Sequence, residues 1–379
     1  MGQRRANIDL LRVFAMFGIV MYHHFGVTVP NHFVELRNGF TEDSFFYDMI
    51  NNIPGAVSKL SLLMDFCYGH FGNGGNLMFM LVTGYFLFGR RSTLEGRVRS
   101  VGRILYAIVF YGLVLTVINF AMLRAFHPID GYEWFKPLFT LPNWLGADNL
   151  WYLQAYGIFL LVILPILKLF EDKLTKSRHA SLCLLLVFLN FLAYATYLPN
   201  LFISRQLLYF AMCYYIGGYV ARYGVKVGRR VLFGALAAYI VLYLLYEYYW
   251  RYSNAVLYAP NEYSYITVME PLACCLVYAI LCFLLFSGFQ MRNGRLAKVL
   301  ESISSSTIGV YIFHLYVIDF SLIIANSFWW HDWSQGGFFV FVVLDSLLLM
   351  TVACLIDVLR KRSMRWLESK LLRPADEAA

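Results

Sequence analysis

Two ionisable residues, Arg12 and His23, interrupt the first apolar segment of the chain. A charged side chain within a membrane segment costs about 2.5–3.5 kcal/mol on insertion scales, so each is a functional candidate. They are eleven residues apart, and three helical turns take about 10.8 residues. We therefore expect both on one helix face, about 16 Å apart along the axis, pointing into one cavity. A neutral histidine there could act as a general base on a hydroxyl group.

Two further polar residues, Asp9 and His24, lie in the same segment. Asp9 is three residues before Arg12, a spacing that allows a local ion pair on a helix. His24 lies about 100° around the helix from His23, so we expect it to pack or bond elsewhere. The sequence leaves open which histidine is the base. Structural roles are the alternative, because arginine can extend to the inner headgroups and histidine can bond a neighbouring helix.

A second basic cluster, Arg99 and Arg103, lies in the stretch RRSTLEGRVRSVGR. Residues four apart share one face of a helix. Paired guanidinium groups suit phosphate, because they keep their charge and donate two hydrogen bonds at once. The pair predicts a clamp for a phosphorylated cytoplasmic molecule; ordinary anchoring by basic residues is the alternative.

The composition requires elements that can hold these residues within a membrane. The chain has 379 residues, of which 60% are hydrophobic and only 14% charged, with a mean hydropathy of +0.60. Soluble domains carry about a quarter charged residues, so a soluble enzyme, a disordered chain and a coiled coil are excluded. The seven cysteines show neither a Cys-x-x-Cys pair nor zinc-ligand spacing, so we expect neither disulfides nor a metal site.

Ten apolar segments predict an all-α, polytopic membrane bundle that forms a single domain over residues 1–379. Helices are expected because lipid cannot satisfy open backbone groups. The segments are 8–28, 70–89, 104–123, 150–169, 180–198, 206–222, 231–250, 264–288, 303–325 and 337–359.

The distribution of basic residues predicts the orientation of these segments. With the N-terminus inside, twenty-four of the 31 Lys and Arg residues fall on inside connections and six on outside ones. Basic residues gather on the cytoplasmic side, so both termini should be cytoplasmic in a multi-pass protein of the cell (cytoplasmic) membrane. Residues 29–69 are then an outer loop or lid, and residues 360–379 a cytoplasmic tail.

Further polar and aromatic residues are candidates for a supporting role. His314 lies within the ninth segment and Glu270 within the eighth, where each could line a cavity or satisfy a neighbouring helix. Asp345 lies within the tenth. Trp151 opens the fourth segment, where packing explains it equally well.

The order of these motifs resembles the membrane acyltransferase 3 family, whose members transfer acyl groups from cytoplasmic acyl-coenzyme A to extracytoplasmic carbohydrate. IDLLRVFAMFGIVMYHH is similar to that family's first helix, in which an Arg, ten residues and a His correspond to Arg12 and His23. RSVGR is similar to its Arg-x-x-x-Arg motif at Arg99 and Arg103. LWYLQAYGIFLLVILP and IGVYIFHLYV resemble two later family segments.

One motif of the family is altered here. Thr83, Gly84 and Tyr85 occupy a turn in which the family usually has Ser-Gly-Phe or Ser-Gly-Tyr. We therefore assign the Thr83 hydroxyl no catalytic role and keep Tyr85 as a supporting residue. No soluble domain follows the tenth segment, so we expect transfer to be completed by the membrane domain, alone or with a partner.

The resemblance implies an O-acyltransferase that uses acyl-coenzyme A, by default acetyl-coenzyme A, as co-substrate, without metal or nucleic acid. Arg99 and Arg103 would hold its phosphates, its arm would pass Arg12, and His23 would deprotonate a carbohydrate hydroxyl. The acceptor, an acyl-histidine relay and the oligomeric state stay open. A transporter or flippase for a lipid-linked saccharide is the main alternative, although the sequence shows no internal repeat of the kind common in transporters. A sensor or scaffold is a third.

Overall fold

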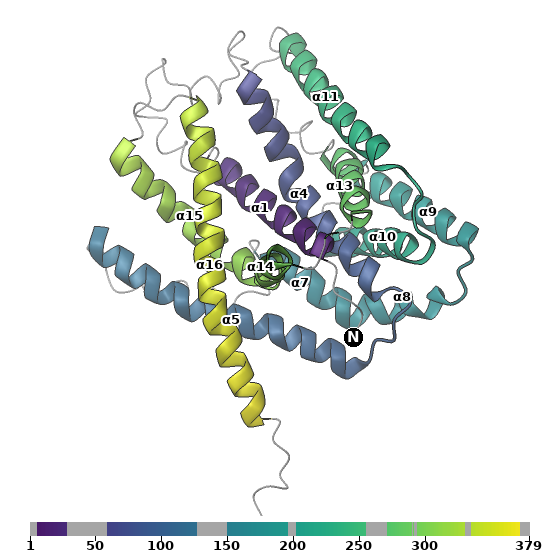
Figure 1. Ribbon diagram of the computed structural model, residues 1–379, viewed down its shortest axis with the longest axis horizontal. Coiled ribbons are helices and arrows are strands. Elements are labelled where there is room, and N and C mark those ends of the chain that lie inside the picture. Colours follow the sequence, from purple (N-terminus) through teal and green to yellow (C-terminus); the bar gives the residue numbers. More distant parts are fainter. Residues whose placement is uncertain are drawn as a thin grey trace, which may run out of the picture.

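The computed structural model describes residues 6–28, 59–126, 150–195, 202–254, 271–289, 291, 294–329 and 335–371. All regular secondary structure in these ranges is helical, which confirms the all-α prediction. The elements are α1 (Ala6–Thr28), α4 (Lys59–Leu87), α5 (Leu94–Phe126), α7 (Trp151–Ile158), the π-helix η3 (Phe159–Ile163), α8 (Leu164–Glu171), α9 (Lys176–Ala195), α10 (Phe202–Tyr223), α11 (Arg229–Asn254), α13 (Pro271–Ser287), α14 (Arg295–Ser304), α15 (Thr307–Trp329) and α16 (Gln335–Leu371) (Figure 1).

Each of the ten predicted segments contains helical structure, with α7, η3 and α8 together forming the fourth. Residues 196–198 of the fifth segment and 264–270 of the eighth lie outside the described residues. The boundaries differ where helices continue past their apolar stretch. α4 begins at Lys59, eleven residues before the predicted segment, and α16 continues to Leu371. Residues 59–69 are therefore helical, whereas 29–58, the rest of the predicted lid, and 372–379, the end of the predicted tail, lie outside the described residues.

Five helical stretches among the described residues are long and apolar enough to cross a membrane. They are 6–24, 94–118, 151–171, 229–246 and 339–370, and 274–287 and 307–318 form shorter apolar helices. Many large apolar side chains on them face outward, such as Leu242 at 65% and Leu355 at 66% exposure. Outward apolar faces on long apolar helices indicate a membrane protein.

The helix α1 lies inside the bundle, where it packs against α4, α13, α14, α15 and α16 (Figure 1). α4 in turn packs closely against α10. Gly84 and Gly217 allow this approach: a Cβ atom on Gly84 would collide with the backbone oxygen of Tyr214, and one on Gly217 with that of Leu81. Small residues at such points let helix backbones come together.

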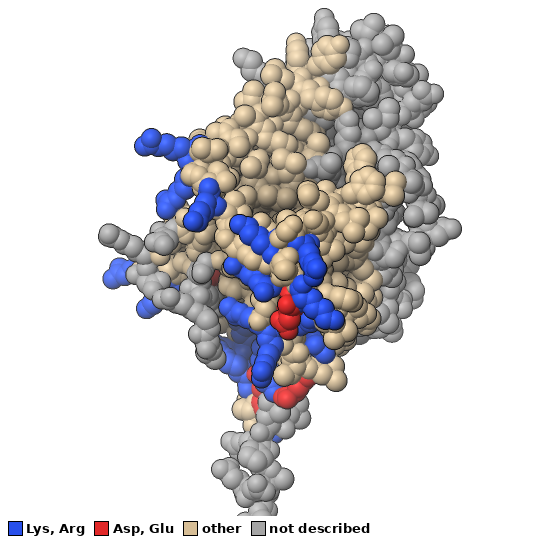
Figure 2. Space-filling model, turned by 90° about the vertical axis from the view of Figure 1, so that its right-hand side faces the viewer, with Lys and Arg blue, Asp and Glu red and all other residues tan. Residues whose placement is uncertain are grey.

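Basic side chains gather at one end of the molecule, and the described surface beyond them is mostly uncharged (Figure 2). A partly buried ion pair joins three helices. The ammonium group of Lys168 donates to the backbone oxygens of Leu87 and Arg90 and pairs with Glu171 at 3.3 Å. Glu171 also accepts a hydrogen bond from the Tyr214 hydroxyl, so α4, α8 and α10 are tied together there.

Candidate active site

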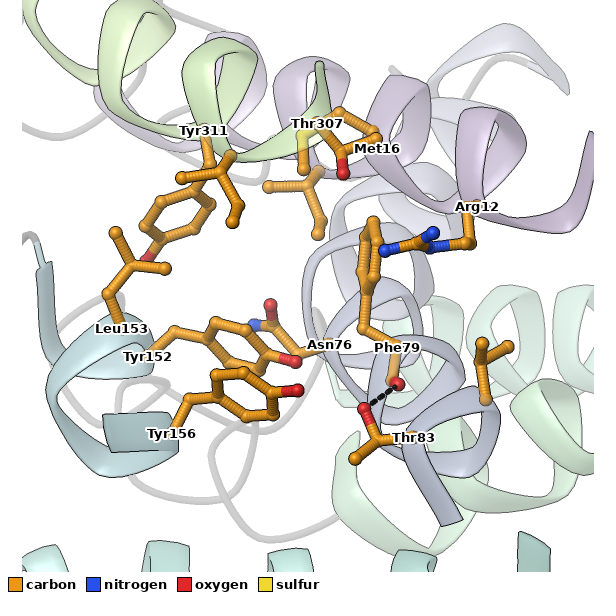
Figure 3. A pocket seen from close by; sticks show the side chains of 13 residues that line it. Arg12, Met16, Asn76, Phe79, Thr83, Tyr152, Leu153, Tyr156, Thr307 and Tyr311 are labelled. Atoms are coloured by element: carbon orange, nitrogen blue, oxygen red, sulfur yellow. Dashed lines mark hydrogen bonds between the residues drawn. The ribbon is translucent and has the colours of Figure 1, made fainter. Parts of the chain in front are cut away.

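A cavity with about 620 Å³ of empty space lies between α1, α4, α7 and α15 (Figure 3). α1 contributes Arg12, Met16 and Ile19 to its wall. These residues are four and three apart, the spacing that places side chains on one helix face. The sequence predicted that Arg12 and His23 point into one cavity; Arg12 borders this one, whereas His23 is not among the residues that line it.

The guanidinium group of Arg12 is held at one side of this cavity. Its Nη1 donates to the hydroxyl of Ser304 at 3.4 Å, and that hydroxyl donates to the carboxylate of Asp9 at 2.7 Å. The guanidinium carbon also lies 6.0 Å from the ring centroid of Phe79, beside which Arg12 is drawn in Figure 3. Asp9 and Arg12 are thus linked through Ser304 of α14, a residue that the sequence analysis did not identify.

A second hollow, with about 890 Å³ of empty space, borders Asp9. Its wall includes Asp9 together with Arg295, Lys298 and Glu301 of α14. The hydrogen-bonded group Asp9–Ser304–Arg12 therefore links a residue that borders this hollow with a residue that borders the cavity.

The structure places His23 beside His314, with ring centroids 5.1 Å apart. His23 is partly exposed and is not among the residues that line the cavity, but it follows Ile19 by one helical turn. His314 likewise follows Tyr311, which lines the cavity from α15. Both lining faces therefore continue toward the same pair of imidazoles.

One nitrogen of His314 has no hydrogen-bond partner within the described part of the chain. Its Nδ1 donates to the backbone oxygen of Val310, one turn earlier on the same helix, at 2.8 Å. Its Nε2 is buried and unbonded. A residue that merely tied two helices together would use this nitrogen for an interhelical bond.

His24 has a different environment from its neighbour. Its ring is fully buried, with Nε2 2.6 Å from the carboxylate of Asp345 and Nδ1 3.0 Å from the backbone oxygen of Val20. Both nitrogens thus face hydrogen-bond acceptors. Such a ring joins α1 to α16, and both of its nitrogens already contact protein groups, the Ser346 hydroxyl at 3.4 Å from Nδ1 among them.

Arg99 and Arg103 lie on α5, outside the two spaces, and the side chain of each is about half exposed. Arg99 pairs with Glu95 at 2.8 Å, and Arg103 pairs with Glu368 of α16 at 3.2 Å. The structure does not bring this pair to the cavity wall.

The supporting candidates have mixed positions. Tyr85 packs edge-to-face against Phe283, with ring centroids 5.7 Å apart, and Trp151 is partly buried against the core. Neither lines the cavity. Glu270 lies outside the described residues.

Asn76 and Tyr156 of the cavity wall were missed as functional candidates. Tyr152 and Tyr156 of α7 stack with centroids 6.2 Å apart, and Asn76 and Thr83 face them from α4 (Figure 3). The Thr83 hydroxyl donates to the backbone oxygen of Phe79 at 2.9 Å. Two aromatic residues four apart, and an amide within an apolar segment, are the signals that could have identified them.

The comparison with protein families matches residues 5–356, nearly the whole chain, to a family described as an acyltransferase domain. This interval contains every residue that lines the cavity. The chain matched no curated protein and no solved structure.

Proposed function

The chain belongs to the acyltransferase 3 family, and from this premise we propose that it transfers an acyl group, acetyl in the first instance, from cytoplasmic acyl-coenzyme A to a hydroxyl of an extracytoplasmic carbohydrate. The family match supports an acyltransferase and gives no support to the transporter alternative. In this proposal the chain crosses the cell membrane ten times with both termini in the cytoplasm. The helical structure of all ten segments and the basic end of the molecule support that topology.

The observation that carries the mechanism is the pair of His23 and His314 beyond the inner faces of α1 and α15. His23 would accept the proton of the acceptor hydroxyl as its oxygen attacks the thioester carbonyl. The carbon–sulfur bond then breaks, and the imidazolium returns the proton to the departing thiolate. His24 is a poor alternative base because both its nitrogens are engaged.

The donor would reach this pair from the basic end. Its arm would pass the hollow beside Asp9 and the cavity beside Arg12, two spaces whose bordering residues are linked through Ser304. Arg99 and Arg103 would hold its phosphates. Their ion pairs with Glu95 and Glu368 are exposed, and such pairs contribute about 0–1 kcal/mol, so a phosphate can displace the carboxylates.

Mass spectrometry of surface glycans tests the proposal. Cells that lack the protein should lose a mass increment of one acyl group, 42 Da being the value for acetyl. The wild-type chain should restore the increment, and the variant His23→Ala, inserted at the same level, should not. In parallel, purified protein should bind labelled acetyl-coenzyme A. Unchanged glycans together with no binding of this donor would contradict the proposed reaction.

A further inference from the structure

Asn76 presents an unused hydrogen-bond acceptor within the cavity. This residue of α4 is only 7% exposed, and its side chain lines the cavity wall. Its Oδ1 atom is buried and has no hydrogen-bond partner among the described residues. Figure 3 shows its amide on the same side of the cavity as the phenol rings of Tyr152 and Tyr156.

A buried carbonyl oxygen without a partner destabilises the empty protein, so its retention requires an explanation. Asn190 of α9, which is also buried, differs: its amide nitrogen donates to the backbone oxygen of Leu186 at 2.8 Å, and none of its buried side-chain atoms is left without a partner. The carbonyl of Asn76 instead belongs to a residue that lines the cavity wall. A ligand that supplies an N–H or O–H donor would complete its hydrogen bonding.

The other residues of the cavity wall indicate what kind of ligand can supply this N–H or O–H group. Met16, Ile19, Val82, Leu153 and Ile308 give it an apolar character. An uncharged chain with isolated amide groups matches a wall that is mostly apolar and has few polar groups. A sugar carries a hydroxyl on almost every carbon, so many of its hydroxyl groups would lack a hydrogen-bond partner there. The pantetheine arm of acyl-coenzyme A is such a chain, with two secondary amides.

We propose that Asn76 accepts a hydrogen bond from one amide N–H of the pantetheine arm and thereby sets the depth at which the thioester stops. Arg12 on one side of the cavity and the two histidines beyond Ile19 would then define the two ends of the bound arm. This inference rests on the proposed function, because it assumes an acyl-coenzyme A donor. Asn76 is a positioning residue in this scheme.

Acetyl-coenzyme A analogues in which one amide N–H of the arm is replaced by an ester oxygen test the proposal. The wild-type protein should bind one of the two analogues about tenfold more weakly than acetyl-coenzyme A, the size of one hydrogen bond. The variant Asn76→Leu should bind acetyl-coenzyme A about tenfold more weakly and no longer distinguish that analogue. If Asn76→Leu discriminates as the wild type does, the proposal is wrong.

The melting temperature of the protein in the absence of acetyl-coenzyme A supplies a second readout. Because leucine removes an unpaired buried acceptor and keeps the volume similar, Asn76→Leu should melt at the same or a higher temperature than the wild type. The matched variant Asn190→Leu removes a hydrogen-bonded amide outside the cavity. It should lower the melting temperature and leave the affinity for acetyl-coenzyme A unchanged. A lowered melting temperature for Asn76→Leu with unchanged donor affinity would mean a structural role. Wild-type protein that binds no acetyl-coenzyme A, together with surface glycans unchanged in its absence, would instead overturn the proposed function itself.

Discussion

Two arginine-bearing regions of this acyltransferase differ in how firmly their charges are held. Arg12 lies within the bundle, linked through Ser304 to the buried carboxylate of Asp9. Arg99 and Arg103 lie half exposed on α5, each paired with one exposed or partly exposed glutamate. The sequence already favours Arg12, because a charge within an apolar segment is costly, but it does not show the solvent exposure of either region.

In these two regions, burial determines how tightly a polar side chain is held by its partners. A buried group has few alternative partners, so its orientation is fixed and its loss leaves another group unsatisfied. An exposed ion pair exchanges readily with water, salt or phosphate. Changes around α1 should therefore have large effects that salt does not relieve, and changes on α5 should have small ones that depend on salt.

The largest effect is expected from His23→Ala. Removal of a general base reduces turnover by about 100- to 10,000-fold, with little change in donor affinity. The measurement is the rate of acetyl transfer by purified protein at saturating acetyl-coenzyme A. As a control, His179→Asn removes a buried histidine that bonds Tyr215 on α10, outside the cavity, and should keep near wild-type turnover per folded molecule. Equal turnover in His23→Ala and the wild type would exclude His23 as the base.

The variant Asp345→Ala should affect stability rather than chemistry. It leaves the buried Nε2 of His24 without its partner 2.6 Å away, and the loss of one member of a buried pair costs about 3 kcal/mol or more. Thermal unfolding in detergent should show a clearly lower melting temperature. The double variant His24→Phe/Asp345→Leu replaces both polar partners and should recover part of the loss. A melting temperature unchanged by Asp345→Ala would show that the pair does not hold α1 to α16.

The sequence predicted the helices well because lipid leaves the backbone little choice. Ten apolar segments required ten helical stretches, and each one is helical in the structure. The ends of α4 and α16 were missed, because a helix can continue into a region where hydropathy no longer requires it. Periodicity also placed Arg12 on an inward face, since its neighbours Met16 and Ile19 line the same cavity.

The rest of the site depends on which helices meet. Ser304 reaches Asp9 across 295 positions of the chain, and His314 reaches the ring of His23 from another helix. No local pattern encodes such contacts. The sequence could not decide between His23 and His24 for the same reason, because the partner of His24, Asp345, lies on α16.

A smaller effect is expected from Arg12→Lys, which keeps the charge. Lysine lacks the planar fork with which arginine can reach the Ser304 hydroxyl and still face the cavity. The affinity for acetyl-coenzyme A should fall about tenfold, the size of one lost charge-assisted hydrogen bond, and added salt should change this factor little. The measurement is a titration with labelled acetyl-coenzyme A at low and high salt. Wild-type affinity in this variant would show that only the charge at position 12 matters.

The smallest effect is expected from Arg99→Gln and Arg103→Gln on the exposed surface of α5. Each should weaken acetyl-coenzyme A binding by about two- to fivefold at low ionic strength, because an exposed charge pair contributes up to about 1 kcal/mol. At about 1 M salt, where the Debye length is about 3 Å, the difference from the wild type should vanish. Arg230→Gln, an exposed basic residue on α11, is the matched control and should have no effect at either salt concentration. A loss of affinity above a hundredfold that persists in high salt would contradict the expected difference between the two regions, since the pair would then bind its ligand as firmly as a buried site. An unchanged affinity at low salt in both variants would mean that Arg99 and Arg103 do not bind the donor and serve only as basic residues at the membrane surface.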